Sequence, residues 1–239
     1  MIGSVIVPVV VVLALAAVAA AVVFFAVKLR SGEALSIPFR SLLVAYFYLL
    51  SAAGFIVLMI GLSGLLNTGL SSVLGRDFGY TRPFKAMPAA IAVPPEGLPG
   101  KAVPVAPTTE EQQKQAEQQQ DRQFREGLLQ GISMFLVGGL VWALHALGRR
   151  RTETAVERES GFLHMAYLAV LLVICSLVGM ISLASGVFDT LRFYLLSPPD
   201  QFSYMTPPGQ NASVALVFTP AWAYYLVSLL RAVRQRHQA

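Results

Sequence analysis

Five long apolar runs alternate with polar segments along this chain. They cover residues 5–27, 41–66, 127–147, 162–188 and 212–230. A helix of about 20 apolar residues spans the hydrocarbon core of a bilayer, where the backbone must satisfy its polar groups within a helix or a closed barrel. Each run meets that length. The pattern therefore predicts an all-α integral membrane protein with five transmembrane helices.

Composition and charge agree with a membrane protein. Apolar residues make up 55% of the 239 residues, charged residues make up 13%, and the mean hydropathy is +0.62, which sets the chain apart from ordinary soluble domains. The net charge of +5 does not indicate a nucleic-acid partner, because the basic residues lie beside the ends of the apolar runs. The lipid bilayer is the expected surrounding. The single cysteine, Cys175, lies inside the fourth run and is interpreted as a small packing residue.

The first run permits two interpretations. Its N-terminal position and its Ala17-Val18-Ala19 sequence resemble a cleavable signal peptide. However, residues 1–8 contain no Lys or Arg, whereas Lys28 and Arg30 follow the run directly. Positive charge is retained on the cytoplasmic side, so these flanks favour an uncleaved anchor with its N-terminus outside.

The other basic residues are consistent with this orientation at every short connection. With the N-terminus outside, the cytoplasmic segments hold Lys28, Arg30, Arg40, Arg149, Arg150, Arg151, Arg158, Arg231, Arg234 and Arg236. The short outer loop holds only Arg192. The long segment between the second and third runs carries no information, because long segments cross regardless of charge. The pattern predicts a multi-pass protein of a bacterial cytoplasmic membrane with its C-terminus inside.

The second and third runs resemble the fourth and fifth. A shift of 121 positions places Met59-Ile60 on Met180-Ile181, and a shift of 80 places Trp142-Ala143 on Trp222-Ala223. Because two consecutive helices cross the membrane and return, both copies would have the same orientation. The similarity predicts a parallel duplication of a two-helix unit, called here the first and second two-helix repeats. Chance similarity between apolar helices is the alternative.

The predicted domain organisation follows from this duplication. Residues 1–39 form an N-terminal anchor with a cytoplasmic link, residues 40–151 form the first two-helix repeat, and residues 152–239 form the second. The first repeat carries an insertion of about forty residues within its long outer loop, at about residues 67–126.

Small side chains occupy matching positions on the second and fourth runs. They are Gly54, Gly61 and Gly64 on the second run and Cys175, Ser182 and Ser185 on the fourth. Small residues let membrane helices approach closely. These six are therefore the predicted helix-packing positions.

The first repeat also resembles a known family. The residues concerned are Tyr46-Phe47-Tyr48-Leu49-Leu50, then Ile60-Gly61-Leu62, and after the loop Gly139-Leu140-Val141-Trp142-Ala143-Leu144-His145. They are similar to bacterial multi-pass membrane proteins catalogued as a domain of unknown function. The resemblance extends over roughly residues 40–236, although the second repeat has Tyr225 where the first has His145. It implies the multi-pass architecture and carries over no catalytic residue or cofactor.

The outer segments have their own patterns. Residues 83–107 are rich in Pro, Ala, Val and Gly, which predicts an extended linker. Thr108 and Glu111 have the spacing of a capping box, and residues 110–125 are nearly all polar helix formers. We expect this helix to run straight into the third span as a solvated stalk, with a partner contact as the alternative. The loop 192–210 combines prolines and aromatic residues, which is typical of the headgroup layer or of a docking surface.

Three ionisable residues lie near span ends: His145, His164 and Asp189. Such groups inside a membrane indicate function unless they reach water or a partner. His145 and His164 belong at the same cytoplasmic level, where each ring reaches water, and where a pair of histidines would also be able to ligate haem. Asp189 stands three residues before Arg192, the spacing of a helical ion pair. Pro220 predicts a kink in the fifth span.

The sequence favours no enzyme and no cofactor, because no spacing sets a nucleophile beside a base. Small-residue stripes without a central charge favour a structural or accessory subunit that packs against other membrane-protein subunits or against a second copy. A small-molecule or ion transporter or channel is the alternative, supported by the duplication and Pro220.

Overall fold

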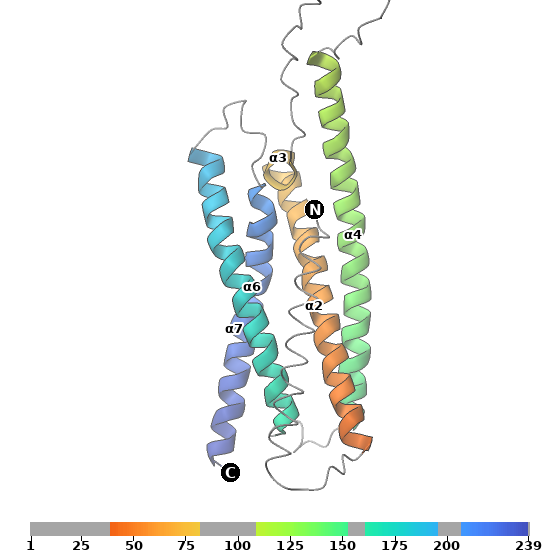
Figure 1. Ribbon diagram of the computed structural model, residues 1–239, viewed down its shortest axis with the longest axis vertical. Coiled ribbons are helices and arrows are strands. Elements are labelled where there is room, and N and C mark those ends of the chain that lie inside the picture. The colour runs from red at the N-terminus through yellow and green to blue at the C-terminus, as the bar shows by residue number, and fades with distance from the viewer. Residues whose placement is uncertain (1–38, 82–108, 153–160, 196–206, 239) are drawn as a thin grey trace, which may run out of the picture. The chain divides into compact units, whose positions relative to one another are not determined.

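The computed structural model describes residues 39–81, 109–152, 161–195 and 207–238. Five α-helices lie in these ranges (Figure 1). They are α2 (Phe39–Leu74), α3 (Arg76–Gly79), α4 (Thr109–Thr152), α6 (Phe162–Leu195) and α7 (Pro208–Gln238). The described ranges contain no strand, which confirms the all-α prediction for them. The predicted first span, the linker at 83–107 and Thr108 lie outside the described residues.

Four helices are long and apolar enough to cross a membrane: α2, α4, α6 and α7. They contain the predicted spans at 41–66, 127–147, 162–188 and 212–230. Each helix is longer than its apolar run, because most of the polar residues at the ends of the runs are compatible with a helix and continue its hydrogen bonding. These four apolar helices indicate a membrane location.

Helix α4 is one continuous helix of 44 residues, about 66 Å long at 1.5 Å per residue. Its polar first part runs into the third span without a break, as predicted (Figure 1). Glu110 and Glu111 lie in the first turn and Arg149, Arg150 and Arg151 in the last. Both groups stabilise the helix through its dipole.

The connection after α6 is shorter than the predicted loop 192–210. Helix α6 continues through Phe193 to Leu195, and α7 begins at Pro208. Proline is favoured in the first helical position, because its missing N–H would have no intrahelical acceptor there. Phe193 is helical because its ring packs edge-on against Phe78 of α3, with centroids 5.9 Å apart. Pro220 lies within α7, which continues to Gln238.

Contacts divide the chain into two compact units. Among the described residues, unit 1 comprises 39–60, 134–152, 161–179 and 217–238, and unit 2 comprises 61–81, 109–133, 180–195 and 207–216. Each of the four long helices contributes one part to each unit. The sequence-based division at 40–151 and 152–239 rests on the repeats and stays a prediction.

Glycines bring α2 and α4 into close contact within unit 1. A Cβ atom at Gly54 would lie 2.6 Å from the Trp142 backbone nitrogen, and one at Gly138 would lie 2.8 Å from the Val57 carbonyl carbon. Such distances to backbone are not tolerated by real side chains. The two contacts also run in opposite directions along the helices. Helices α2 and α4 are therefore antiparallel, and they approach closely only because these positions lack a side chain.

Unit 2 has glycine contacts of the same kind. A Cβ atom at Gly131 of α4 would lie 3.0 Å from Leu65 Cδ2 of α2, and one at Gly186 of α6 would lie 3.0 Å from the Ala212 nitrogen of α7. Glycine thus serves both the α2–α4 pair and the α6–α7 pair. In the absence of a hydrophobic drive between helices in lipid, this close approach supplies much of their association.

Candidate functional site

A cluster of aromatic and polar side chains, the tyrosine cluster, joins three helices of unit 1. It comprises Tyr48 and Ser51 of α2, Arg149 of α4, and His164 and Tyr167 of α6. The Arg149 guanidinium carbon lies 4.6 Å from the Tyr48 ring centroid and 5.1 Å from that of Tyr167. A planar cation is attracted to aromatic faces. Arg149 therefore fastens the end of α4 to both α2 and α6.

Hydroxyl and imidazole groups complete the tyrosine cluster. The Tyr48 hydroxyl and His164 Nδ1 share a hydrogen bond of 3.3 Å, and the Ser51 and Tyr167 hydroxyls lie 3.5 Å apart. Ser51 is fully buried and Tyr48 is buried. Buried polar groups are costly unless they are paired. These contacts let Tyr48 and Ser51 lie inside the bundle, whereas Arg149, His164 and Tyr167 are half-buried.

The structure places the two predicted histidines on different sides of α2. His145 Nδ1 donates a 2.7 Å hydrogen bond to the Val141 carbonyl, and its ring packs against Tyr46 at 5.8 Å. His164 instead packs against Tyr48 at 6.3 Å. Residues two apart on a helix point about 200° from each other. The paired arrangement that a shared haem would require is therefore not formed by these rings.

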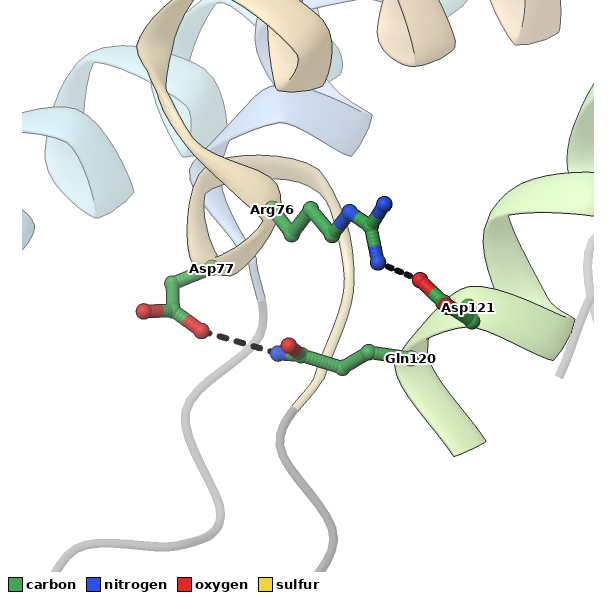
Figure 2. A network of polar contacts seen from close by, with 4 residues as sticks. All are labelled: Arg76, Asp77, Gln120 and Asp121. Atoms are coloured by element: carbon green, nitrogen blue, oxygen red, sulfur yellow. Dashed lines mark hydrogen bonds and ion pairs between the residues drawn. The ribbon is translucent and has the colours of Figure 1, made fainter. Parts of the chain in front are cut away.

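A second polar group, the α3 clasp, comprises residues 76–80 and their partners in unit 2. The chain turns at Gly75, whose φ of 101° suits glycine, and α3 then meets α4. Asp77 accepts a 2.8 Å hydrogen bond from Gln120, and Arg76 forms an ion pair with Asp121 (Figure 2).

The inner side of the α3 clasp rests on α2. The Tyr80 hydroxyl lies 2.9 Å from Thr68 Oγ1, and Asn67 donates a 3.3 Å hydrogen bond to the Gly79 carbonyl. Within α2, Ser71 donates a 2.6 Å hydrogen bond to the Asn67 carbonyl. Burial raises the pKa of Tyr80, and the hydrogen bond to Thr68 opposes this effect. The clasp is therefore fixed to α2 on one side and to α4 on the other.

Asp189 has a different partner from the predicted one. Its Oδ2 accepts a 2.8 Å hydrogen bond from Asn211 of α7, and the described residues show no ion pair between Asp189 and Arg192. The helical spacing permits that pair. The Asp189 carboxylate is instead paired with the side-chain amide of Asn211 across the α6–α7 contact. Asp189 thus joins two helices of unit 2.

The six predicted packing residues are buried or half-buried. Gly54, Gly61, Cys175 and Ser182 are buried, whereas Gly64 and Ser185 are half-buried. Sequence analysis missed the glycines of α4, although Gly127 and Gly131 have the GxxxG spacing that indicates helix contact. It also missed the Arg149 stack and the α3 clasp, for which no sequence pattern exists.

A surface hollow of about 310 Å³ is lined by Gln118, Asp121, Arg122, Arg125, Glu126 and Leu129. All these residues lie on α4, so one helix face provides the walls. Within the described ranges, no three His, Cys, Asp or Glu side chains gather as metal ligands would.

One known family is similar to part of the chain. Residues 109–208 match the family described as Domain of unknown function (DUF5671). The match includes all of α4 and α6, and with them the residues Gly139 to His145 that carried the resemblance. It confirms the similarity to a domain of unknown function for these residues, whereas the Tyr46–Leu50 motif lies outside them. No curated protein and no solved structure matches the chain.

Proposed function

We propose that this chain is a structural or accessory subunit of a membrane assembly and has no catalytic role. The observation that carries this proposal is the fixed position of α4. Its apolar part packs on α2 through glycines, and its polar part is held by the α3 clasp at Gln120 and Asp121. Residues 109–126 thereby extend about 27 Å beyond the apolar run.

The side chains of this extension face solvent on most sides. Lys114, Gln115, Glu117, Gln118 and Gln119 are all exposed. A helix held at its base presents such groups in a fixed direction, which lowers the ordering cost of binding. Polar amide and carboxylate groups suit a hydrophilic surface of another subunit or of a second copy.

The proposed duplication is supported by equivalent helix contacts. In unit 1, Gly138 contacts Leu58 and Gly179 contacts Phe218. Shifts of 121 and 80 place Leu58 on Gly179 and Gly138 on Phe218, so one contact maps onto the other. Chance similarity of apolar sequences predicts no such match.

A second pair of equivalent contacts lies in unit 2. Gly131 contacts Leu65, and Gly186 contacts Asn211. The same two shifts place Leu65 on Gly186 and Gly131 on Asn211. The glycine changes helix between the repeats while the close contact is kept. We therefore infer that α2–α4 and α6–α7 are two parallel copies of one helical hairpin.

For orientation, we propose an N-terminus outside and a C-terminus inside a bacterial cytoplasmic membrane. The end of α4 carries Arg149, Arg150 and Arg151, and the last part of α7 carries Arg231 and Arg234. At the opposite ends of the apolar runs, the short connection between α6 and α7 has only Arg192 among its described residues. Because short connections decide orientation, this bias supports a cytoplasmic location for the Arg149 and Arg231 ends.

Cysteine labelling tests the orientation. In a Cys175→Ser background, Gln115→Cys is expected to react with an impermeant thiol reagent added to intact cells, because the α4 extension would lie outside. Gln235→Cys is expected to react only after the cells are opened. Both positions are exposed in the folded protein. A cysteine that does not react in intact cells is therefore separated from the reagent by the membrane. Labelling of position 235 from outside would reverse the topology.

Photocrosslinking tests the accessory role. A photoreactive amino acid at Gln115 or Gln118 is expected to capture one defined membrane-associated partner, or a second copy, in native membranes. The same amino acid at Gln235, which is also exposed but lies at the end of α7, is the matched control. Capture of the same proteins from all three positions, or of none from the extension, contradicts the proposal.

A transporter or channel remains the alternative proposal, favoured by the tyrosine cluster. Its protic groups lie buried or half-buried between α2 and α6, and chains of such groups can pass protons. In proteoliposomes loaded with a pH-sensitive dye, a proton leak that depends on Tyr48 and His164 would favour transport. Equal leak rates in wild type, Tyr48→Phe and His164→Gln would leave the accessory role as the better account.

A further inference from the structure

Helix α4 is less covered than the other candidate spans. In the most apolar 18-residue stretch of α4, 11% of the window is buried inside the structure. The corresponding share is 39% for α2 and 33% each for α6 and α7. The bare face of α4 in unit 1 carries large apolar side chains, namely Leu136, Val137, Leu140, Leu144 and Leu147. Leu136 and Leu140 are each 61% exposed.

We propose that the first apolar run of this chain, residues 5–27, packs against this face of α4. The run is joined to α2 by residues 28–38, and α2 begins at Phe39. That end of α2 lies beside the end of α4, since Phe47 contacts Gly148. The two ends that must meet are therefore close together.

The connecting length is sufficient for this arrangement. Eleven residues reach at most about 36–40 Å when extended, whereas packed helices lie about 8–10 Å apart. A tether of this length also gives the run a high effective concentration at α4, which a second copy or a free partner lacks. Tethering favours the chain's own segment as the occupant.

The side chains of the run suit the bare face. Ala16 and Ala20, and Ala17 and Ala21, have the four-residue spacing of small residues that permit close approach. The α4 face is bulky, so small residues opposite it let the helices interlock. With its N-terminus outside, the run would be parallel to α4 and would place Lys28 at the same end as Arg149.

Disulfide crosslinking tests the proposal in native membranes. One cysteine is placed at each of positions 17–20 in turn, which covers a full helical turn, and a second replaces Leu140, all in a Cys175→Ser background. The expected result is an intramolecular disulfide from at least one position. It is identified by mass spectrometry in the monomer.

Val173→Cys on α6 is the matched control. Val173 is 55% exposed, and contacts with α2 place it within about one turn of the level of Leu140. Several-fold more disulfide is expected with Leu140→Cys than with Val173→Cys. Gly179→Cys with Phe218→Cys is the positive control, because a Cβ atom at Gly179 would lie 3.8 Å from Phe218 Cβ, the separation found in disulfides. Its reaction shows that the oxidant works within the apolar part of the helices.

Four outcomes would overturn the proposal. They are an excess of disulfide with Val173→Cys, disulfides found only between two copies, no disulfide when the positive control reacts, and cleavage of the run. An N-terminal tag that is retained in the purified protein shows that the run was present, and its loss shows cleavage. None of these outcomes depends on capture of an external partner at the α4 extension.

Discussion

Gly138→Ala is expected to destabilise the α2–α4 pair strongly. The new Cβ atom would lie 2.8 Å from the Val57 carbonyl carbon and 2.9 Å from Leu58 Cα. Because backbone atoms cannot rotate away, the helices must separate, and overpacking of this kind costs about 1–3 kcal/mol. Thermal unfolding in mild detergent, followed by size-exclusion chromatography, is expected to show a melting temperature several degrees lower.

Gly139→Ala is the control for this experiment. It changes the adjacent residue in the same way, yet its Cβ atom would meet Leu58 Cδ1 at 3.5 Å, an ordinary contact. Alanine is also a better helix former than glycine. We expect Gly139→Ala to keep wild-type stability or to exceed it. Equal melting temperatures for the two variants would show that α4 does not pack on α2 as described.

Gly79→Ala is expected to open the α3 clasp. The added Cβ atom would overlap the Ser71 hydroxyl and lie 2.9 Å from Asn67 Oδ1. Ser71 must then leave the Asn67 carbonyl, to which it donates a 2.6 Å hydrogen bond. The loss of a buried hydrogen bond together with the steric strain costs about 1–3 kcal/mol. Trypsin is expected to cut faster at Arg122 and Arg125, because the freed part of α4 unfolds more often.

A double variant distinguishes this mechanism from general damage. Ser71→Ala removes the hydroxyl that Gly79→Ala would strike, so the combined loss is expected to be smaller than the sum of the two single losses. Strictly additive effects on cleavage at Arg122 would mean that the two residues do not meet. Unchanged cleavage in Gly79→Ala alone would mean that the clasp does not hold the α4 extension.

The two glycine experiments bear on the proposed function in different ways. Gly138 lies in the apolar part of α4, whereas Gly79 lies in the clasp that holds the polar part. If the extension is the docking element, Gly79→Ala is expected to reduce photocrosslinking from Gln115 while Gly139→Ala leaves it unchanged. Trypsin cleavage measures whether Gly79→Ala opens the clasp. Photocrosslinking then measures separately whether docking of the extension depends on the clasp.

The four described spans were predictable because lipid imposes a simple requirement. An apolar run of sufficient length becomes a helix wherever no water is present to satisfy the backbone. The continuous α4 was predictable for a related reason, since residues 110–125 are strong helix formers followed directly by an apolar run. Helix ends were less predictable. The continuation of α6 to Leu195 depends on packing between Phe193 and Phe78, which are far apart in sequence.

The sequence by itself therefore determined which residues form long membrane helices and which small residues were available for contact. Only the tertiary structure decided which helix each small residue meets, and it showed that Gly54 and Gly64 pack against α4 of the same chain. It also decided the partners of Arg149, His164 and Asp189. The physical reason is that helix formation depends on local hydrogen bonding and solvent. A stacked cation or a clasp depends instead on distances between segments that no local pattern encodes.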